Sequence, residues 1–295
     1  MIFAKNISKV YRQKFREISA LENVSLEIRK GELFGLVGPD GAGKTSLFRI
    51  LTTLIQPDGG VATVCGFDVM KDLAEIRRRI GYMPGRFSLY QDLSVEENLN
   101  FFADIFGTTV EANYDVIRDI YVQIEPFKTR RAGKLSGGMK QKLALCCALV
   151  HKPEALFLDE PTTGVDPVSR KEFWAILRKL IDAGITIMVS TPYMDEASLC
   201  QRIALIQNGK ILSVDTPQNI VNQNNNTIFE IRSPNNYALQ QSLRERADVA
   251  SCYMFGDTLH LVFQNNILPD NLPQDIDIRR IMPAIEDCFI ELMKQ

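Results

Sequence analysis

The sequence predicts an α/β domain built around a parallel sheet, followed by a smaller α+β domain. Short apolar segments typical of buried strands occur at 33–37, 156–158 and 185–189. A helical pattern follows the first of them from 44 to about 54, and another separates the last two at 168–183. Because strands that alternate with helices favour a parallel sheet covered by helices, we expect an α/β core.

The stretches around this alternation predict further β and helical structure. The first stretch is typical of a hairpin-rich β region, because 24–28 alternates apolar and polar residues and 29–31 supplies a turn. From about 94 to 150 the pattern is mostly helical, and Ser94 and Glu97 begin this region with the spacing of a capping box. We therefore expect a β region before the alternation and a helical region within it.

The C-terminal part of the chain is expected to form a separate domain. A hairpin at 203–212, with the type I′ turn signal Asn208-Gly209, completes the first domain. The segment NQNNN at 222–226 is polar and poor in core-forming residues, so we place a domain boundary there. Region 227–295 has the pattern strand, helix, hairpin, strand, helix, with the hairpin turn at 256–257.

Composition and charge exclude several classes of protein. With 45% hydrophobic and 24% charged residues, the chain resembles an ordinary soluble globular protein. Lys and Arg total 34 against 36 Asp and Glu, so no basic excess indicates nucleic-acid binding. The longest apolar run, 143–150, is too short to span a membrane, and the N-terminus lacks a signal-peptide core. Any role at a membrane is expected to require a separate partner.

The six cysteines do not predict a zinc site, because none of them has the C-x-x-C spacing. Cys146 and Cys147 lie inside an apolar helical pattern. We interpret them as buried small hydrophobic residues of a protein from a reducing compartment.

A glycine-rich segment, GPDGAGKT, follows a predicted strand and begins a predicted helix, a context that an ordinary glycine-rich turn does not need. Glycines let backbone N–H groups surround phosphate oxygens, and the helix N-terminus adds positive charge. Lys44 is expected to reach the β- and γ-phosphates of ATP, and Thr45 to bind Mg²⁺. The residues expected to contact nucleotide are Gly38, Pro39, Asp40, Gly41, Ala42, Gly43, Lys44, Thr45 and Ser46.

Two acidic residues end the predicted strand in ALFLDEP, 155–161. In parallel α/β sheets this edge binds ligands. Asp159 is expected to hold Mg²⁺, and Glu160 to polarise the attacking water as the catalytic base. Two acids in a solvated loop would look the same, and the phosphate loop upstream favours the catalytic interpretation.

A second anion-binding helix start is predicted in LSGGMKQ, 135–141. Ser136 can cap a helix that starts at about Gly137, so that its hydroxyl and the backbone N–H groups face one anion. A plain N-cap would explain Ser136 but not the pair Gly137 and Gly138. Because the chain already has a phosphate loop, this segment predicts contact with a second nucleotide.

GPDGAGKT, LSGGMKQ and LDEPTTGVDP, in this order, resemble the ATP-binding subunit of ABC transporters over about residues 1–220. The resemblance implies a P-loop NTPase (RecA-like) core with an antiparallel β subdomain and a helical subdomain at about 88–150. It divides the chain into an ATP-binding domain, 1–222, and a C-terminal accessory domain, 227–295. It also implies head-to-tail dimers, in which ATP lies between the phosphate loop of one subunit and the LSGG helix of the other.

The resemblance assigns further roles. Tyr11 falls where the family stacks an aromatic ring on adenine, although it would otherwise be a half-buried strand residue. Asp166 matches the loop that crosses between the two sites, or is a turn aspartate before proline. The segment 283–293 resembles the tail of ATPases that work with ABC-2-type permeases, although an amphipathic helix packed on a sheet would look similar.

These ATPases work at the cytoplasmic face of the inner membrane, where they bind their permease subunits. A periplasmic adaptor protein is a further partner that the resemblance allows. The implied docking groove lies near 81–106, where Phe87, Leu89 and Tyr90 either face the permease or pack in the core.

Two positions depart from the family pattern. Gly85 replaces the glutamine that senses Mg²⁺ and the attacking water, and Pro192 replaces the switch histidine that touches the γ-phosphate. Proline has neither a side-chain donor nor a backbone N–H. Gln91 lies too far along the chain to substitute, and His151 and His260 are expected to be ordinary structural residues. The resemblance therefore implies that this chain's own site hydrolyses ATP slowly.

Asp40 and the missing histidine together resemble the first ATP-binding half of tandem, fused exporter ATPases. A second ATP-binding subunit is therefore expected, with a heterodimer favoured over a homodimer. One alternative is a soluble ABC ATPase that acts in translation or DNA repair, a class that usually has two such domains or a long coiled coil. Another is an ATP-binding regulator that barely hydrolyses, which is compatible with an exporter subunit.

Overall fold

The computed structural model of the chain describes residues 1–13, 16–269, 272 and 276–294. The chain divides into two compact units, Met1–Thr216 and Pro217–Gln295. Within the described ranges, no helix has both the length and the apolar character needed to cross a bilayer.

A six-stranded sheet forms the centre of the first unit, in the order β10-β9-β3-β8-β7-β6. Its neighbouring strands are parallel except for the hairpin β9–β10. The strands are β3 (Leu33–Val37), β6 (Ile80–Met83), β7 (Ala155–Asp159), β8 (Thr186–Thr191), β9 (Arg202–Gln207) and β10 (Lys210–Asp215). Strands β3, β7 and β8 are buried along their whole length, as parallel strands covered on both faces should be. The predicted parallel core is confirmed.

The predicted N-terminal β region is an antiparallel sheet in the order β2-β1-β4-β5. Its strands are β1 (Ile2–Gln13), β2 (Arg16–Ile28), β4 (Gly59–Val64) and β5 (Phe67–Asp68). Their apolar side chains share one core with β3, β7 and helix α1 (Lys44–Leu51). This helix ends before the predicted position 54, because Thr53 adopts a left-handed backbone conformation with φ +62°. The short helix α2 (Leu73–Arg79) precedes β6.

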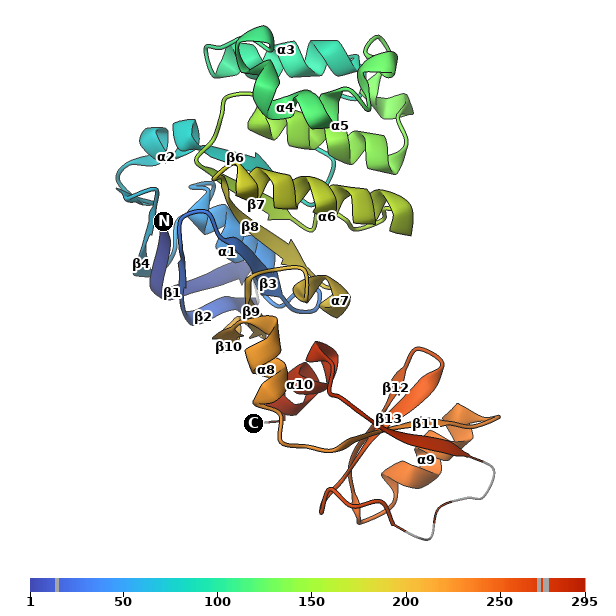
Figure 1. Cartoon of the computed structure of the whole chain (residues 1–295). Coiled ribbons are helices and arrows are strands. Elements are labelled where there is room, and N and C mark those ends of the chain that lie inside the picture. The colour runs from blue at the N-terminus through green and yellow to red at the C-terminus, as the bar shows by residue number, and fades with distance from the viewer. Residues whose placement is uncertain (14–15, 270–271, 273–275, 295) are drawn as a thin grey trace. The chain divides into compact units, whose positions relative to one another are not determined.

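The helical region gathers at the end of the unit opposite the antiparallel strands (Figure 1). It contains α3 (Val95–Ile105), α4 (Tyr114–Tyr121), α5 (Gly137–Leu149) and the short 3₁₀ helices η1 (Glu111–Asn113), η2 (Glu125–Phe127) and η3 (Ala132–Lys134). Helices α6 (Pro167–Asp182) and α7 (Met194–Ala197) follow β7 and β8. The predicted capping box is present, because Ser94 Oγ accepts from Glu97 N at 3.2 Å and Ser94 N donates to Glu97 Oε2 at 2.7 Å.

The second unit has the predicted order of strand, helix, hairpin, strand and helix, preceded by α8 (Pro217–Asn222). These elements are β11 (Ile228–Arg232), α9 (Asn236–Arg244), β12 (Val249–Phe255), β13 (Thr258–Phe263), β14 (Asp277–Ile281) and α10 (Ile285–Leu292). The strands form an antiparallel sheet in the order β12-β13-β11-β14. Eight buried residues of β11, α9, β12 and β13 form a core within this unit.

All six cysteines are free, and five of them are buried. Cys146 and Cys147 are among these five, in agreement with their interpretation as small core residues. The sixth, Cys65, is half-buried, and burial raises the pKa of its thiol to about 11.

Candidate nucleotide-binding site

The glycine-rich loop lies at the C-terminal edge of the central sheet, between β3 and α1. Its glycines are required by the backbone that surrounds them. A Cβ atom at Gly38 would lie 2.1 Å from the carbonyl oxygen of Ile206, and one at Gly43 would lie 2.4 Å from that of Ala20. Gly43 also has φ +106°, a conformation that favours glycine. The loop can therefore keep this path only with glycine at these two positions.

The turn of the β9–β10 hairpin forms a backbone hydrogen bond with this loop. Gly209 N donates to Ala42 O at 2.9 Å, and Gly209 O accepts from Glu22 N at 2.8 Å. Asn208 and Gly209 have φ values of +49° and +75°, as the predicted type I′ turn requires. The loop is thus held from outside its own sequence.

Lys44 is buried inside the loop, with 3% of its surface exposed. Its Nζ donates to Gly38 O at 2.8 Å and to Pro39 O at 2.9 Å. The same atom lies 3.1 Å from Glu160 Oε1. Two motifs that are far apart in the sequence therefore supply one cation and one carboxylate to the same place.

Asp159 ends strand β7 and Glu160 follows it, and Ser190 of β8 forms hydrogen bonds with both of them. Ser190 Oγ donates to Asp159 Oδ1 at 2.6 Å and accepts from Glu160 N at 3.0 Å. Glu160 has φ +50°, which is rare for a residue other than glycine. The sequence did not single out Ser190, because its role follows from the register that places it opposite Asp159.

Tyr11 lies beside the first turn of α1. Its hydroxyl is 3.2 Å from Ser46 Oγ, and its ring is partly exposed. The loop, Lys44, the acidic pair and Tyr11 therefore come together on one side of the unit.

Ser136 caps α5, as predicted, by accepting from Met139 N at 3.3 Å. The two glycines that follow have different surroundings. A Cβ atom at Gly138 would lie 2.6 Å from Ser169 Oγ of α6, whereas one at Gly137 would meet nothing closer than Gly164 O at 3.7 Å. Packing thus accounts for Gly138, while Ser136 and Gly137 are exposed.

Asp166 caps α6 through Oδ1, which accepts from Val168 N at 3.1 Å and Ser169 N at 3.0 Å. The hydrogen bond from Ser169 N lowers the pKa of this exposed carboxyl. The segment that begins α5 and the segment that begins α6 are therefore in contact at Gly138 and Ser169.

Comparison with known proteins places the chain in a family. Residues 21–163 match the family described as ABC transporter. The "Nod factor export ATP-binding protein I" of Burkholderia orbicola is 35% identical over 81% of this chain and 79% of its own length. The chain belongs to the ATP-binding proteins of ABC transporters.

Other relatives agree with this assignment. The "Probable multidrug ABC transporter ATP-binding protein YbhF" of Escherichia coli is 40% identical over 93% of this chain, which spans about half (49%) of that relative's length. Among solved structures, a dimeric ATP-binding cassette in a post-hydrolysis state with ADP and Pi covers 73% of this chain, with TM-score 0.67 and 27% identity. The predicted fold class, a P-loop core with antiparallel and helical subdomains, is confirmed.

Of the two departures from the ABC pattern, Gly85 lies next to the acidic pair and Pro192 lies at the end of β8. A Cβ atom at Gly85 would lie 3.0 Å from Asp159 O and 3.7 Å from Glu160 Cβ. Pro192 directly follows β8, two positions after Ser190. A side chain at position 85 would therefore start close to Asp159 and Glu160.

The glutamine and the two histidines that could have replaced the missing side chains form other contacts. Gln91 O accepts from Gly133 N at 2.9 Å in the helical region. His151 stacks on Phe106 with ring centroids 3.7 Å apart, and its Nε2 donates to Ile80 O at 3.0 Å. His260 is buried in the second unit.

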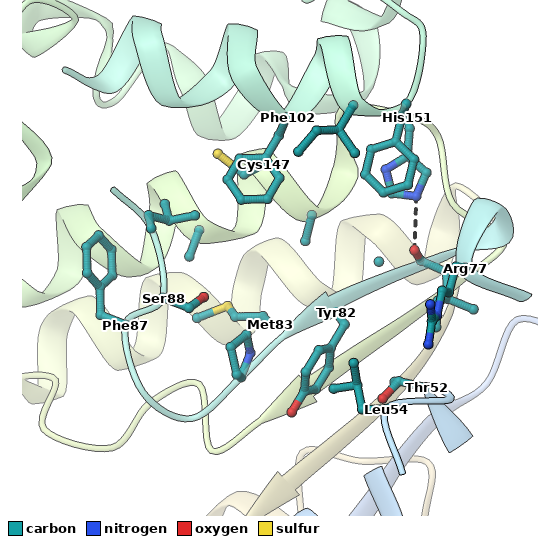
Figure 2. Close-up of a pocket in the computed structure, with 18 of the residues that line it drawn as sticks. Thr52, Leu54, Arg77, Tyr82, Met83, Phe87, Ser88, Phe102, Cys147 and His151 are labelled. Atoms are coloured by element: carbon teal, nitrogen blue, oxygen red, sulfur yellow. Dashed lines mark hydrogen bonds between the residues drawn. The ribbon is translucent and has the colours of Figure 1, made fainter. Parts of the chain in front are cut away.

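An apolar cavity of about 340 Å³ lies between β6 and helices α3 and α5. Figure 2 shows Phe102 and Cys147 facing Tyr82 and Met83 across it. Burial raises the pKa of Tyr82 to about 12, and the charge of Asp159 adds to this shift. No carboxylate is among the lining residues that the structure describes.

The three residues expected in the docking groove differ in their positions. Phe87 and Leu89 line the cavity, and Leu89 is buried. Tyr90 is 51% exposed and packs edge-on against Phe101 at a centroid distance of 4.8 Å.

Proposed function

We propose that this chain is the ATPase subunit of a multi-subunit ABC exporter that drives transport through separate ABC-2-type permease subunits. The observation that carries the proposal is the meeting of Lys44 with Glu160 at 3.1 Å inside the glycine-rich loop, beside Asp159. A relative named for Nod factor export supports the direction of transport.

The residues present fit a magnesium–nucleotide complex. Backbone N–H groups of the loop and Lys44 Nζ supply positive charge for the phosphates. Thr45 and Asp159 offer the hydroxyl and carboxylate oxygens that would hold Mg²⁺, which neutralises phosphate charge when bound. Tyr11 offers a partly exposed ring for adenine. Glu160 orients the attacking water and accepts its proton, and the anchoring of its backbone by Ser190 fixes its direction.

A second ATP-binding subunit completes the site. Ser136 and Gly137 expose the start of α5, a helix of 13 residues, so this end can receive an anion from another molecule. The solved cassette that this chain resembles is described as a dimer with ADP and Pi. We propose that Ser136, Gly137, Gly138 and Asp166 serve the nucleotide bound by the second subunit.

The two sites of this dimer are proposed to be unequal. A preorganised donor at the developing charge contributes about 10²–10³ in rate. At positions 85 and 192 this chain offers no side-chain donor, because glycine and proline have none. Its own site should therefore bind ATP but hydrolyse it slowly, and a heterodimer with one active site follows.

Two variants, each combined with the second ATP-binding subunit of the same transporter, test this asymmetry. Ser136→Ala should abolish hydrolysis at the second subunit's site, whereas Glu160→Gln should lower the total ATPase rate much less. Rapid hydrolysis by the isolated chain that disappears in Glu160→Gln would contradict the proposal of a slow site.

The apolar cavity is proposed to receive the permease at the cytoplasmic face of the membrane. Among the residues that line it, Leu54 and Ile105 are 53% and 58% exposed, so the cavity presents apolar surface that a partner can cover. Leu54→Glu and Ile105→Glu should each reduce co-purification with permease-containing membranes. Val61→Glu is the matched control, because Val61 is 57% exposed on β4 and does not line the cavity. Equal retention of all three variants would exclude this groove.

A further inference from the structure

Glu196 of α7 is a charged residue that the nucleotide-binding motifs do not include. Only 1% of its surface is exposed. One carboxylate oxygen accepts a hydrogen bond from Thr162 Oγ1 at 2.7 Å, and the other accepts from Thr191 Oγ1 at 2.5 Å. A buried carboxylate is costly unless its oxygens are hydrogen-bonded, so this arrangement depends on both hydroxyl groups.

Thr191 connects Glu196 to the phosphate loop. Its carbonyl oxygen accepts from Gly38 N at 3.2 Å, at the first residue of that loop. Its hydroxyl oxygen also accepts from Tyr193 N at 3.0 Å. Because Pro192 between them has no N–H, the side chain of Thr191 supplies the hydrogen bond that orders this part of the chain.

Thr162 connects Glu196 to the turn that follows Glu160. In this turn Thr163 N donates to Glu160 O at 3.2 Å, and Val165 N donates to Thr162 O at 3.1 Å. The next residue, Asp166, caps α6. The position of the catalytic carboxylate is therefore tied through Thr162 to the carboxylate of Glu196.

Arg170 of α6 faces the same carboxylate. Its Nε lies 3.6 Å from Glu196 Oε1, and its guanidinium group lies 4.3 Å from the centre of the Tyr193 ring. Helix α6 thus approaches Glu196 from a third side, and the negative charge has a nearby cation.

We propose that Glu196 is a positioning residue for ATP hydrolysis, because it joins the β8 end (190–193) to the turn after Glu160 (160–166). This inference rests on the proposed ATPase function. It predicts that Mg-ATP bound at the phosphate loop orders the turn through Thr191, Glu196 and Thr162. Without Glu196 the phosphate loop keeps its hydrogen bond from Gly209 N and still binds nucleotide. Glu160, however, is no longer aligned with the attacking water.

Hydrogen exchange of the full-length chain, with and without Mg-ATP, tests this connection. In the parent, Mg-ATP should protect 38–45, 160–166 and 190–193 together. In Glu196→Ala, protection of 38–45 should remain while that of 160–166 is lost. Asp195→Asn is the matched control, because Asp195 is its exposed neighbour and faces the same Arg170 at 3.8 Å. Unchanged protection of 160–166 in Glu196→Ala would overturn the proposal.

Steady-state hydrolysis gives a second readout. In the chain alone, where every turnover comes from its own slow site, Glu196→Ala should lower kcat a further 10-fold to 100-fold, roughly, with KM nearly unchanged, since small misplacements of catalytic groups have effects of this size. Glu196→Gln should restore most of the rate, because its amide can pair with both threonines. If Glu196→Ala keeps the parent kcat, the positioning role is wrong.

The same experiments separate this inference from the proposed function. If Mg-ATP does not protect 38–45 in the parent, the ATPase function fails. In that case, hydrogen exchange measured without nucleotide still tests whether Glu196 connects 160–166 to 190–193. Faster exchange of both 160–166 and 190–193 in Glu196→Ala supports it, and unchanged exchange rejects it.

Discussion

At the scale of single residues, the charged groups of the nucleotide site are held by one another and by nearby hydroxyl and carbonyl groups. Lys44 is bound by two loop carbonyls and pairs with Glu160, and Asp159 is bound by Ser190. Such buried polar groups are stable only when their hydrogen-bonding capacity is used. Replacement of one member should therefore affect its neighbours as well as the ligand.

Lys44→Ala should weaken Mg-ATP binding about 10- to 100-fold, the equivalent of losing a charge-assisted contact of roughly 1.5–3 kcal/mol. A titration with a fluorescent ATP analogue measures this change. Lys152→Ala is the matched control, because Lys152 is an exposed lysine that pairs with Asp115. Equal affinities of Lys44→Ala and the parent would exclude the loop as the nucleotide site.

At the scale of elements, the contact between α5 and α6 depends on a missing side chain. Gly138 leaves no room for a Cβ atom against Ser169, so the two helices approach closely at their N-terminal ends. This packing also sets the position of Ser136, the cap of α5, relative to Asp166, the cap of α6.

Gly138→Ala should lower the free energy of unfolding of the first unit by about 1–3 kcal/mol, the usual effect of overpacking. Urea unfolding followed by fluorescence of Trp174 measures it, because this single tryptophan is buried in α6. Gly137→Ala should unfold like the parent, since a Cβ atom there has space. If Gly138→Ala unfolds with the same free energy as the parent, helices α5 and α6 can move apart with little loss of stability.

In the second unit, Asp287 of α10 carries a pH-dependent part of the stability. Burial acts to raise the pKa of Asp287, but hydrogen bonds from His260, Tyr253 and Ala284 N together lower it below the ordinary value of 3.8. Since the folded pKa is the lower one, the stabilisation is fully present above about pH 3.8 and is lost as pH falls further.

Asp287→Asn should therefore destabilise the second unit at pH 7 and differ progressively less from the parent below pH 3.8. Hydrogen exchange of β13 at a series of pH values measures this difference. Asp257→Asn is the control, because Asp257 is an exposed carboxylate of the same unit, which pairs with Arg232. A difference that stays constant down to pH 2 would contradict the assignment to this carboxyl.

The sequence predicted the elements better than the contacts between them. The periodicity of apolar residues and the turn residues located the buried strands, because both depend on local residue type. The segment GPDGAGKT located the phosphate loop. Ser190 and Glu196 escaped prediction because Asp159, the partner of Ser190, lies 31 residues away and Thr162, a partner of Glu196, lies 34 residues away. These pairs meet only through strand register and loop packing. The sequence predicts Gly138 as an anion-site residue, and its additional packing against Ser169 became visible only with α6 in place.

At the scale of the whole molecule, each unit has its own apolar core. The first core joins the antiparallel strands to β3, α1 and β7, and the second lies among β11, α9, β12 and β13. Helix α8 belongs to the second unit, where it packs on α10. We therefore propose that the first unit folds independently.

A chain that ends at Asn222 should bind Mg-ATP with the affinity of the full chain but assemble less well into the transporter. A chain that ends at Thr216 should bind equally, because α8 contributes to the second unit. Nucleotide titration and thermal unfolding measure both. Global unfolding of the two shortened chains would show that the second unit is required for the first core.

The burial of the thiols makes this chain well suited to chemical labelling. Maleimides react with thiolates, and buried cysteines with raised pKa values are inert. Five of the six cysteines are buried, and Cys65 has a pKa of about 11, so the natural chain should react little at neutral pH. Ser136→Cys would add one exposed thiol at the start of α5. A fluorophore attached there would report the arrival of a second subunit without prior removal of any native cysteine.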